Sequence, residues 1–189
     1  MAPETLGVPV DAESFKLGMR RLAAGVCLIT TQCPDGSRRG MTATAICSVS
    51  ANPPVLLCCI NRRNSSYDAI HQSRLFAISV LSIEDRPLAD LFAQPVPAEQ
   101  KFASALWQTR VTGAPMLESA LAAFDCRVGQ DVVVGTHGIL FGEIQDVTVR
   151  RGAAKPLLYA HGGYGGFASF GEASDPESLW IPGWNYEPS

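Results

Sequence analysis

The residues best suited to chemistry in this chain are small and hydroxyl-bearing side chains gathered in one extended segment, Gly40 to Val55. Thr, Ile and Val favour β-strand, whereas Gly, Ala and Ser leave room beside the backbone. A core strand normally carries larger side chains, so this composition indicates a surface that offers hydrogen bonds to a large planar ligand. An ordinary Thr/Ser-rich edge strand is the alternative. The candidate contacts are Thr42, Ala43, Thr44, Ser48, Val49 and Ser50.

A second group of residues suits an anion. Asn61, Ser65 and Ser66 precede or begin a predicted helix, where amides, hydroxyls and the helix dipole favour negative charge. Simple capping by Asn64 or Ser65 explains the same pattern, and both roles are compatible. Arg62 and Arg63 either add positive charge to this site or are simply solvated.

Many short strands with mostly short turns must position these residues. The predicted strands are Val26–Gln32, the returning segment after the Cys33–Gly36 turn, Val55–Ile60, Leu75–Leu81, Leu121–Val128, Asp131–Val134, a long strand through Val149, and Pro156–Ala160. The predicted helices run from a cap at Asp11 to about Ala24 with Gly25 ending it, from Asn64 or Ser65 to about Gln72, from Ser82 or Asp85 to Phe92, and over Lys101–Trp107. Gly162–Gly166 is expected to be a flexible connection. This pattern favours a mainly β protein with peripheral helices, folded as a closed or nearly closed antiparallel barrel.

Composition narrows the class of protein. The 189 residues predict one domain at 11–170, flanked by a flexible N-terminal arm at 1–10 and a C-terminal tail at 171–189. A formal charge of −3 gives no reason to expect nucleic acid or a membrane surface as partner. Charged residues are only 17% of a chain that is 47% hydrophobic, which predicts extra buried surface in a homodimer. Six cysteines without metal or C-x-x-C spacing predict free, mostly buried thiols, a reducing cytoplasmic location and no metal.

Four motifs in order resemble the short-chain flavin reductase family, the reductase components of two-component flavin-dependent monooxygenases. They are the Gly40–Val55 segment, Asn61–Ser66, Gly135–Ile144 and Pro156–Tyr159, and the resemblance spans roughly Phe15 to Phe167. It implies an FMN-binding split β-barrel with Greek-key connections.

The resemblance also implies ligand contacts. Lys101 and Phe102 match a basic–Phe pair near the flavin, and His137 and Tyr159 match residues beside the nicotinamide. The family places Asp before the histidine, whereas this chain has Thr136, which changes how the imidazole is oriented. Because hydride transfer occurs between the cofactors, no catalytic acid, base or nucleophile is expected.

The implied activity is reduction of FMN or FAD by NADH, with NADPH as the alternative, and release of reduced flavin to a separate monooxygenase. A non-catalytic flavin-binding or storage protein of the same fold is a rival interpretation. A third, a pyridoxamine-phosphate-oxidase-like enzyme, calls for more basic residues around a second phosphate than the sequence contains.

Overall fold

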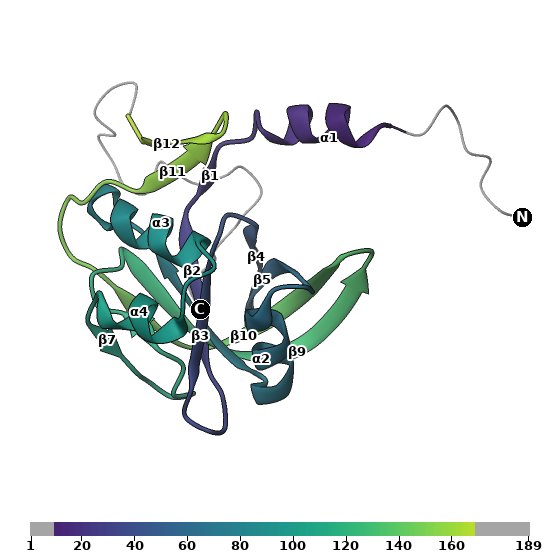
Figure 1. The fold of residues 1–189 in the computed structure, drawn as a ribbon. Coiled ribbons are helices and arrows are strands. Elements are labelled where there is room, and N and C mark those ends of the chain that lie inside the picture. Colours follow the sequence, from purple (N-terminus) through teal and green to yellow (C-terminus); the bar gives the residue numbers. More distant parts are fainter. Residues whose placement is uncertain (1–9, 169–189) are drawn as a thin grey trace, which may run out of the picture.

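The computed structural model describes residues 10–168, and a seven-stranded antiparallel sheet forms its centre (Figure 1). The strands follow the spatial order β3-β2-β6-β9-β10-β5-β4. Their bounds are β2 Cys27–Gln32, β3 Arg38–Ala43, β4 Ile46–Ala51, β5 Pro54–Asn61, β6 Leu75–Val80, β9 Ala122–Val134 and β10 His137–Val149. The predicted mainly β, antiparallel class with peripheral helices is therefore confirmed.

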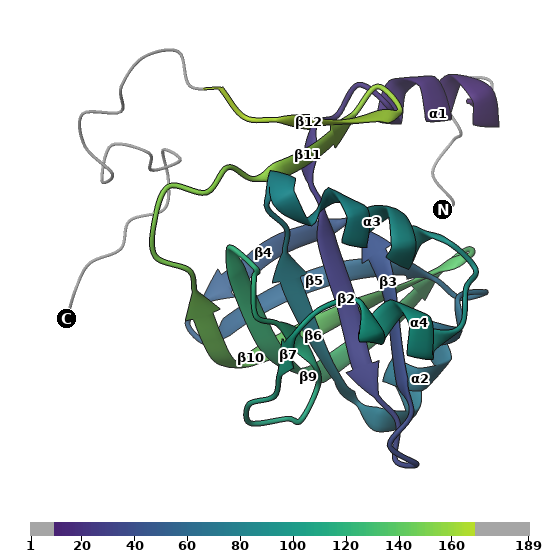
Figure 2. The same ribbon diagram turned by 60° about the vertical axis from the view of Figure 1, so that its left-hand side comes forward.

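The sheet rolls into a barrel that stays open between its two edge strands, β3 and β4 (Figure 2). Only Thr44 and Ala45 join these strands, so the chain crosses the opening at this point. The sequence predicted one continuous strand returning from the Cys33–Gly36 turn, and this prediction was wrong. Its first half pairs with β2 and its second half pairs with β5, and the two pairings lie at opposite ends of the sheet order.

A second, three-stranded sheet lies at one end of the barrel (Figure 2). It contains β1 Ala24–Gly25, β11 Leu157–Ala160 and β12 Gly163–Gly166. The glycine run is thus a paired strand and not the expected flexible connection, because β12 completes its backbone hydrogen bonds against β11. A small two-stranded sheet is formed by β7 Trp107–Gln108 and β8 Met116–Leu117.

The helices are α1 Ala12–Met19, α2 Ser65–Ser73, α3 Arg86–Ala93 and α4 Ala98–Ala103, with a 3₁₀ turn η1 Ile83–Asp85 before α3. The predicted caps of the first two are confirmed: the Asp11 side chain accepts from the amides of Glu13 and Ser14, and that of Asn64 from the amide of Ser66. A capping box between Ser82 and Asp85 opens η1.

Three predicted boundaries were wrong, each because tertiary contacts outweighed local preference. Helix α1 ends at Met19, since Ala24 and Gly25 pair with β11. Helix α4 ends at Ala103, because the Trp107 indole folds back and donates to the Phe102 carbonyl at 2.9 Å. Strand β9 runs unbroken through Gly129, which is accommodated as a bulge opposite β10.

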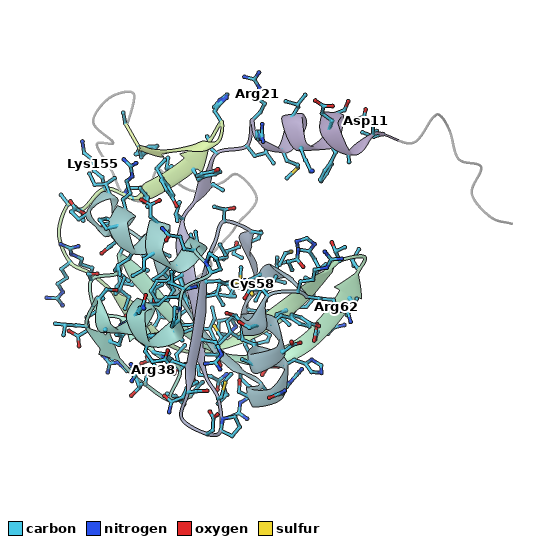
Figure 3. All side chains as sticks on the ribbon, in the orientation of Figure 1. Asp11, Arg21, Arg38, Cys58, Arg62 and Lys155 are labelled. Atoms are coloured by element: carbon cyan, nitrogen blue, oxygen red, sulfur yellow. The ribbon has the colours of Figure 1, made fainter. Side chains whose placement is uncertain are left out.

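Two hydrophobic clusters hold the barrel together. The interior cluster includes Ile29, Cys58 and Phe76, and the other lies beneath α3 and α4 and includes Leu28 and Phe92. Successive residues Leu28 and Ile29 enter different clusters because side chains alternate across a strand. Figure 3 shows Cys58 among the barrel strands. Of the six free cysteines, Cys27, Cys58 and Cys126 are buried, Cys33 and Cys59 are half-buried and Cys47 is exposed.

Helix α1 extends away from the barrel and buries none of its residues (Figure 1). Among residues 10–168, no helix is long and apolar enough to cross a membrane. The expected C-terminal tail and all but the last residue of the expected arm lie outside the described residues.

Candidate flavin-binding site

The crossing between β3 and β4 borders an apolar cavity of about 530 Å³. Thr44 and Tyr159, two predicted ligand contacts that are distant in sequence, both line it. The remaining lining residues come from the crossing and β4 (Ala45, Ile46, Cys47), from β5 (Leu57, Cys59) and from α1 and the segment after it (Phe15, Lys16, Met19, Arg20, Leu22, Ala24). Flat apolar walls beside an exposed crossing suit a planar ring.

A smaller polar cavity of about 210 Å³ lies at the other end of β3. It brings together two predicted phosphate contacts, Ser65 at the start of α2 and Lys101 on α4, with Arg39 on β3. Two cationic side chains and the positive end of a nine-residue helix favour an anion such as a phosphate. Glu99 also lines the cavity and supplies the opposing charge.

Lys101 is tied to the protein at this cavity. Its Nζ donates to the Phe92 carbonyl at 3.1 Å and to the Gly40 carbonyl at 3.4 Å, and the residue is only 9% exposed. Burial lowers the pKa of this amine. Lys101 therefore ties α4 to both β3 and α3, and these two bonds use two of its three N–H groups.

Strand β3 connects the two cavities. Thr44 lies five positions after Arg39, which is about 16 Å of extended strand. As an edge strand, β3 leaves one side of its backbone free of sheet partners in the described structure. Between the cavities, the side chain of Ala43 is buried. The Thr42 hydroxyl donates to the Ala89 carbonyl at 2.6 Å and so links β3 to α3.

His137 begins β10 directly opposite Asn61 at the end of β5. Strand alternation puts both on the same outer face as Cys59, one of the apolar cavity's lining residues. The exposed imidazole has its Nδ1 2.9 Å from the Thr136 hydroxyl, so the residue that stands in place of the family Asp contacts the ring but supplies no carboxylate. The Asn61 side chain already makes one local hydrogen bond, because its Oδ1 accepts from the Arg63 amide at 3.0 Å.

The structure separates other predicted residues from the cavities. Ser48, Val49 and Ser50 lie farther along β4 at a bulge, and the Ser50 hydroxyl accepts from the Asn52 amide at 3.1 Å. Ser66 is 2% exposed, and its backbone amide donates to the Asn64 side chain that caps α2. Phe102 packs in the core with its ring 4.8 Å from that of Trp107.

Tyr159 belongs to the small sheet, not to the barrel. The centroid of its ring lies 5.4 Å from that of Tyr164 in an edge-on arrangement. Tyr159 remains 38% exposed to solvent. This packing fixes the ring at the apolar cavity while leaving part of it available to a ligand.

Among the residues that line the polar cavity, Arg39 is the main one that sequence reasoning missed. A charged residue next to the Asp-Gly turn resembles any solvated hairpin position, and its only available signal was that it precedes Gly40 in the ligand-binding segment. Cys47, Leu57 and Cys59 also line the apolar cavity and were likewise missed, because each looks like an ordinary strand residue in the sequence.

A split barrel with an apolar cavity beside a cation-lined one defines a protein that holds a planar, anionic cofactor. The model of the flavin reductase like domain matches residues 19–168. The chain belongs to this family.

Known proteins agree with this assignment. The FMN reductase (NADH) RutF of Escherichia coli K12 is 47% identical over 138 residues, covering 73% of this chain and 84% of that protein. A crystal structure of a predicted flavin reductase from Haemophilus somnus 129PT superposes with a TM-score of 0.80 and 37% identity, covering 84% and 100% of the two chains. BorF, the flavin reductase component of a bacterial two-component tryptophan halogenase, gives a TM-score of 0.77 at 27% identity over 84% of this chain and 99% of BorF.

Proposed function

We propose that this chain is an NADH-dependent FMN reductase. The observation that carries the proposal is the pair of cavities joined by β3: one apolar and bordered by Thr44 and Tyr159, the other lined by Arg39, Ser65 and Lys101. An apolar ring site and a cation-lined anion site at opposite ends of one strand suit a cofactor with a planar ring and one terminal phosphate. The name of the E. coli relative supports FMN over FAD and NADH over NADPH.

The side chains present serve binding and orientation. Flavin and nicotinamide supply the hydride chemistry when both are bound. Arg39 and Lys101 neutralise phosphate charge, the apolar cavity excludes water from one side of the ring, and backbone groups at Thr44–Ala45 offer hydrogen bonds at its edge. His137, on the outer face beyond Cys59, contacts the dinucleotide.

We further propose that reduced flavin is released to a separate oxygenase-type enzyme. BorF, a reductase component of a two-component system, supports this inference by its similar structure. The six free thiols support a reducing, cytoplasmic location.

Titration of the apoprotein with FMN and FAD, followed by NADH and NADPH oxidation assays under air, tests the proposal. We expect catalytic NADH oxidation with kcat/KM at least several-fold higher for FMN than for FAD. Stoichiometric flavin binding without turnover would instead show a flavin-storage protein, and preference for FAD or NADPH would overturn the cofactor assignment.

A further inference from the structure

A partly buried hydrogen-bonded cluster joins α2 to the β9–β10 hairpin, outside both proposed ligand cavities and at the wall of a third, surface cavity. The Tyr67 hydroxyl lies 3.1 Å from Asp131 Oδ2 and 3.3 Å from Oδ1, and it donates to this carboxylate. His71, one helical turn later, places Nδ1 2.9 Å from Asp131 Oδ2. Tyr67 is 6% exposed and the Asp131 side chain 9%, whereas the His71 side chain is 60% exposed. Asp131 is therefore held by two partners, one buried phenol and one exposed imidazole.

The same tyrosine packs against the residue that follows His137. A Cβ added to Gly138 would overlap Tyr67 Cε2 and lie 2.8 Å from its Cζ, so glycine provides the space for the ring. The hairpin tip is tied a second time, because the Arg62 amide donates to the Thr136 carbonyl at 3.0 Å. Figure 3 shows Arg62 near the end of this hairpin.

The position of Tyr67 within α2 links the two parts of the proposed site. It comes two residues after Ser65, which lines the polar cavity, and its ring reaches the start of β10. Alternation along β10 directs His137 to the opposite face from Gly138, so Tyr67 acts on the hairpin backbone and does not touch the imidazole.

We propose that Tyr67 and Asp131 are positioning residues that hold the β9–β10 tip, and with it His137, at a fixed place relative to the phosphate-binding start of α2. This inference rests on the proposed contact between His137 and the dinucleotide. Burial raises the pKa of Tyr67, and its bond to Asp131 acts in the same direction, so the phenol keeps its proton and remains the donor.

The variants Tyr67→Phe and Asp131→Asn test the proposal. Tyr67→Phe keeps the ring in the space beside Gly138 and removes only the donor. We expect the KM for NADH to rise about three- to tenfold, as for one lost buried hydrogen bond, while the Kd for FMN changes less than twofold. Asp131→Asn should produce the same split. Gln72→Ala, on the exposed side of the same helix, is the matched control and should leave both constants unchanged.

A double-mutant cycle with His137→Ala separates positioning from general destabilisation. If Tyr67 acts through His137, Tyr67→Phe should add no further rise in KM once the imidazole is removed. An equal rise in both backgrounds, or no rise in either, would overturn the proposal. If His137→Ala alone leaves the KM for NADH unchanged, His137 does not contact the dinucleotide and the proposed function of this residue is wrong. If His137→Ala raises the KM but Tyr67→Phe does not, only the positioning role of Tyr67 is wrong.

Discussion

At the residue scale, the polar cavity gives a prediction about Arg39. Arg39 lines the same cavity as Ser65 and Lys101, and its Nη1 donates to the Arg38 carbonyl at 2.8 Å. If its remaining donors bind the flavin phosphate, Arg39→Ala should remove one charge-assisted contact. Affinity for FMN should fall about tenfold, whereas affinity for riboflavin, which lacks the phosphate, should stay the same. Fluorescence titration of both flavins measures the two values.

Arg63→Ala is the matched control for this substitution, because Arg63 is exposed and does not line the cavity. Equal losses for FMN and riboflavin in Arg39→Ala would show that Arg39 shapes the ring site or the fold and does not bind phosphate.

At the element scale, the contact between β10 and α2 makes Gly138 sensitive to any side chain. Gly138→Ala should lower the free energy of unfolding by about 1–3 kcal/mol, because the buried Tyr67 ring has to move. Gly163→Ala on β12 meets no atom within 4 Å and should change stability little. Urea unfolding of both variants checks the difference, and similar stabilities would contradict the close packing of Tyr67 on this strand.

The buried cysteine thiols of the strands predict how the free energy of unfolding changes at alkaline pH. Burial raises the pKa of Cys58 to about 12 from its ordinary value of 9.0. The folded chain then keeps a proton that the unfolded chain releases, so this stabilisation is complete below pH 9 and is lost as pH rises toward 12. Unfolding free energies measured between pH 8.5 and 10.5 should fall less steeply in Cys58→Ala, by up to about 1.4 kcal/mol per pH unit. Parallel curves would show that the thiol titrates normally.

At the scale of the whole molecule, exposed apolar surface leads us to expect a homodimer. Phe15 on α1 and Leu22 just after this helix are 60% and 61% exposed beside the apolar cavity, and α1 buries none of its residues. A second copy of the chain would cover this surface in a symmetric pair. Sedimentation at micromolar concentration should give about 40 kDa, twice the 20.2 kDa of one chain.

Charge placed on this face should separate the subunits. Phe15→Glu combined with Leu22→Glu should shift the protein toward the monomer, whereas Leu17→Glu, which does not line the cavity, should have less effect. An active parent protein that sediments as a monomer would refute the homodimer.

Much of the fold was predictable because its signals are local. Short, mostly apolar runs marked β2, β5 and β6, Pro-Asp-Gly marked the hairpin turn, and Asn64 was one of two expected caps at the start of α2. The expected anion site at that helix start depended on the same few consecutive residues, and the structure places Ser65 at a cation-lined cavity. The ends of α1 and α4 were not predictable, because strand pairing at Ala24 and the fold-back of Trp107 come from distant partners.

By itself, the sequence determined a mainly β chain with small and hydroxyl residues in one extended segment, and its motif order indicated the flavin reductase family. Only the tertiary structure decided that this segment splits at Thr44 between opposite edges of the sheet, and that Tyr159 meets it there. Only the tertiary structure places Arg39 and Lys101 at one cavity and packs the Tyr67 ring against Gly138. These juxtapositions depend on which strands pair and in what register, and that choice is set by the burial of apolar side chains across the whole barrel, which no local pattern encodes.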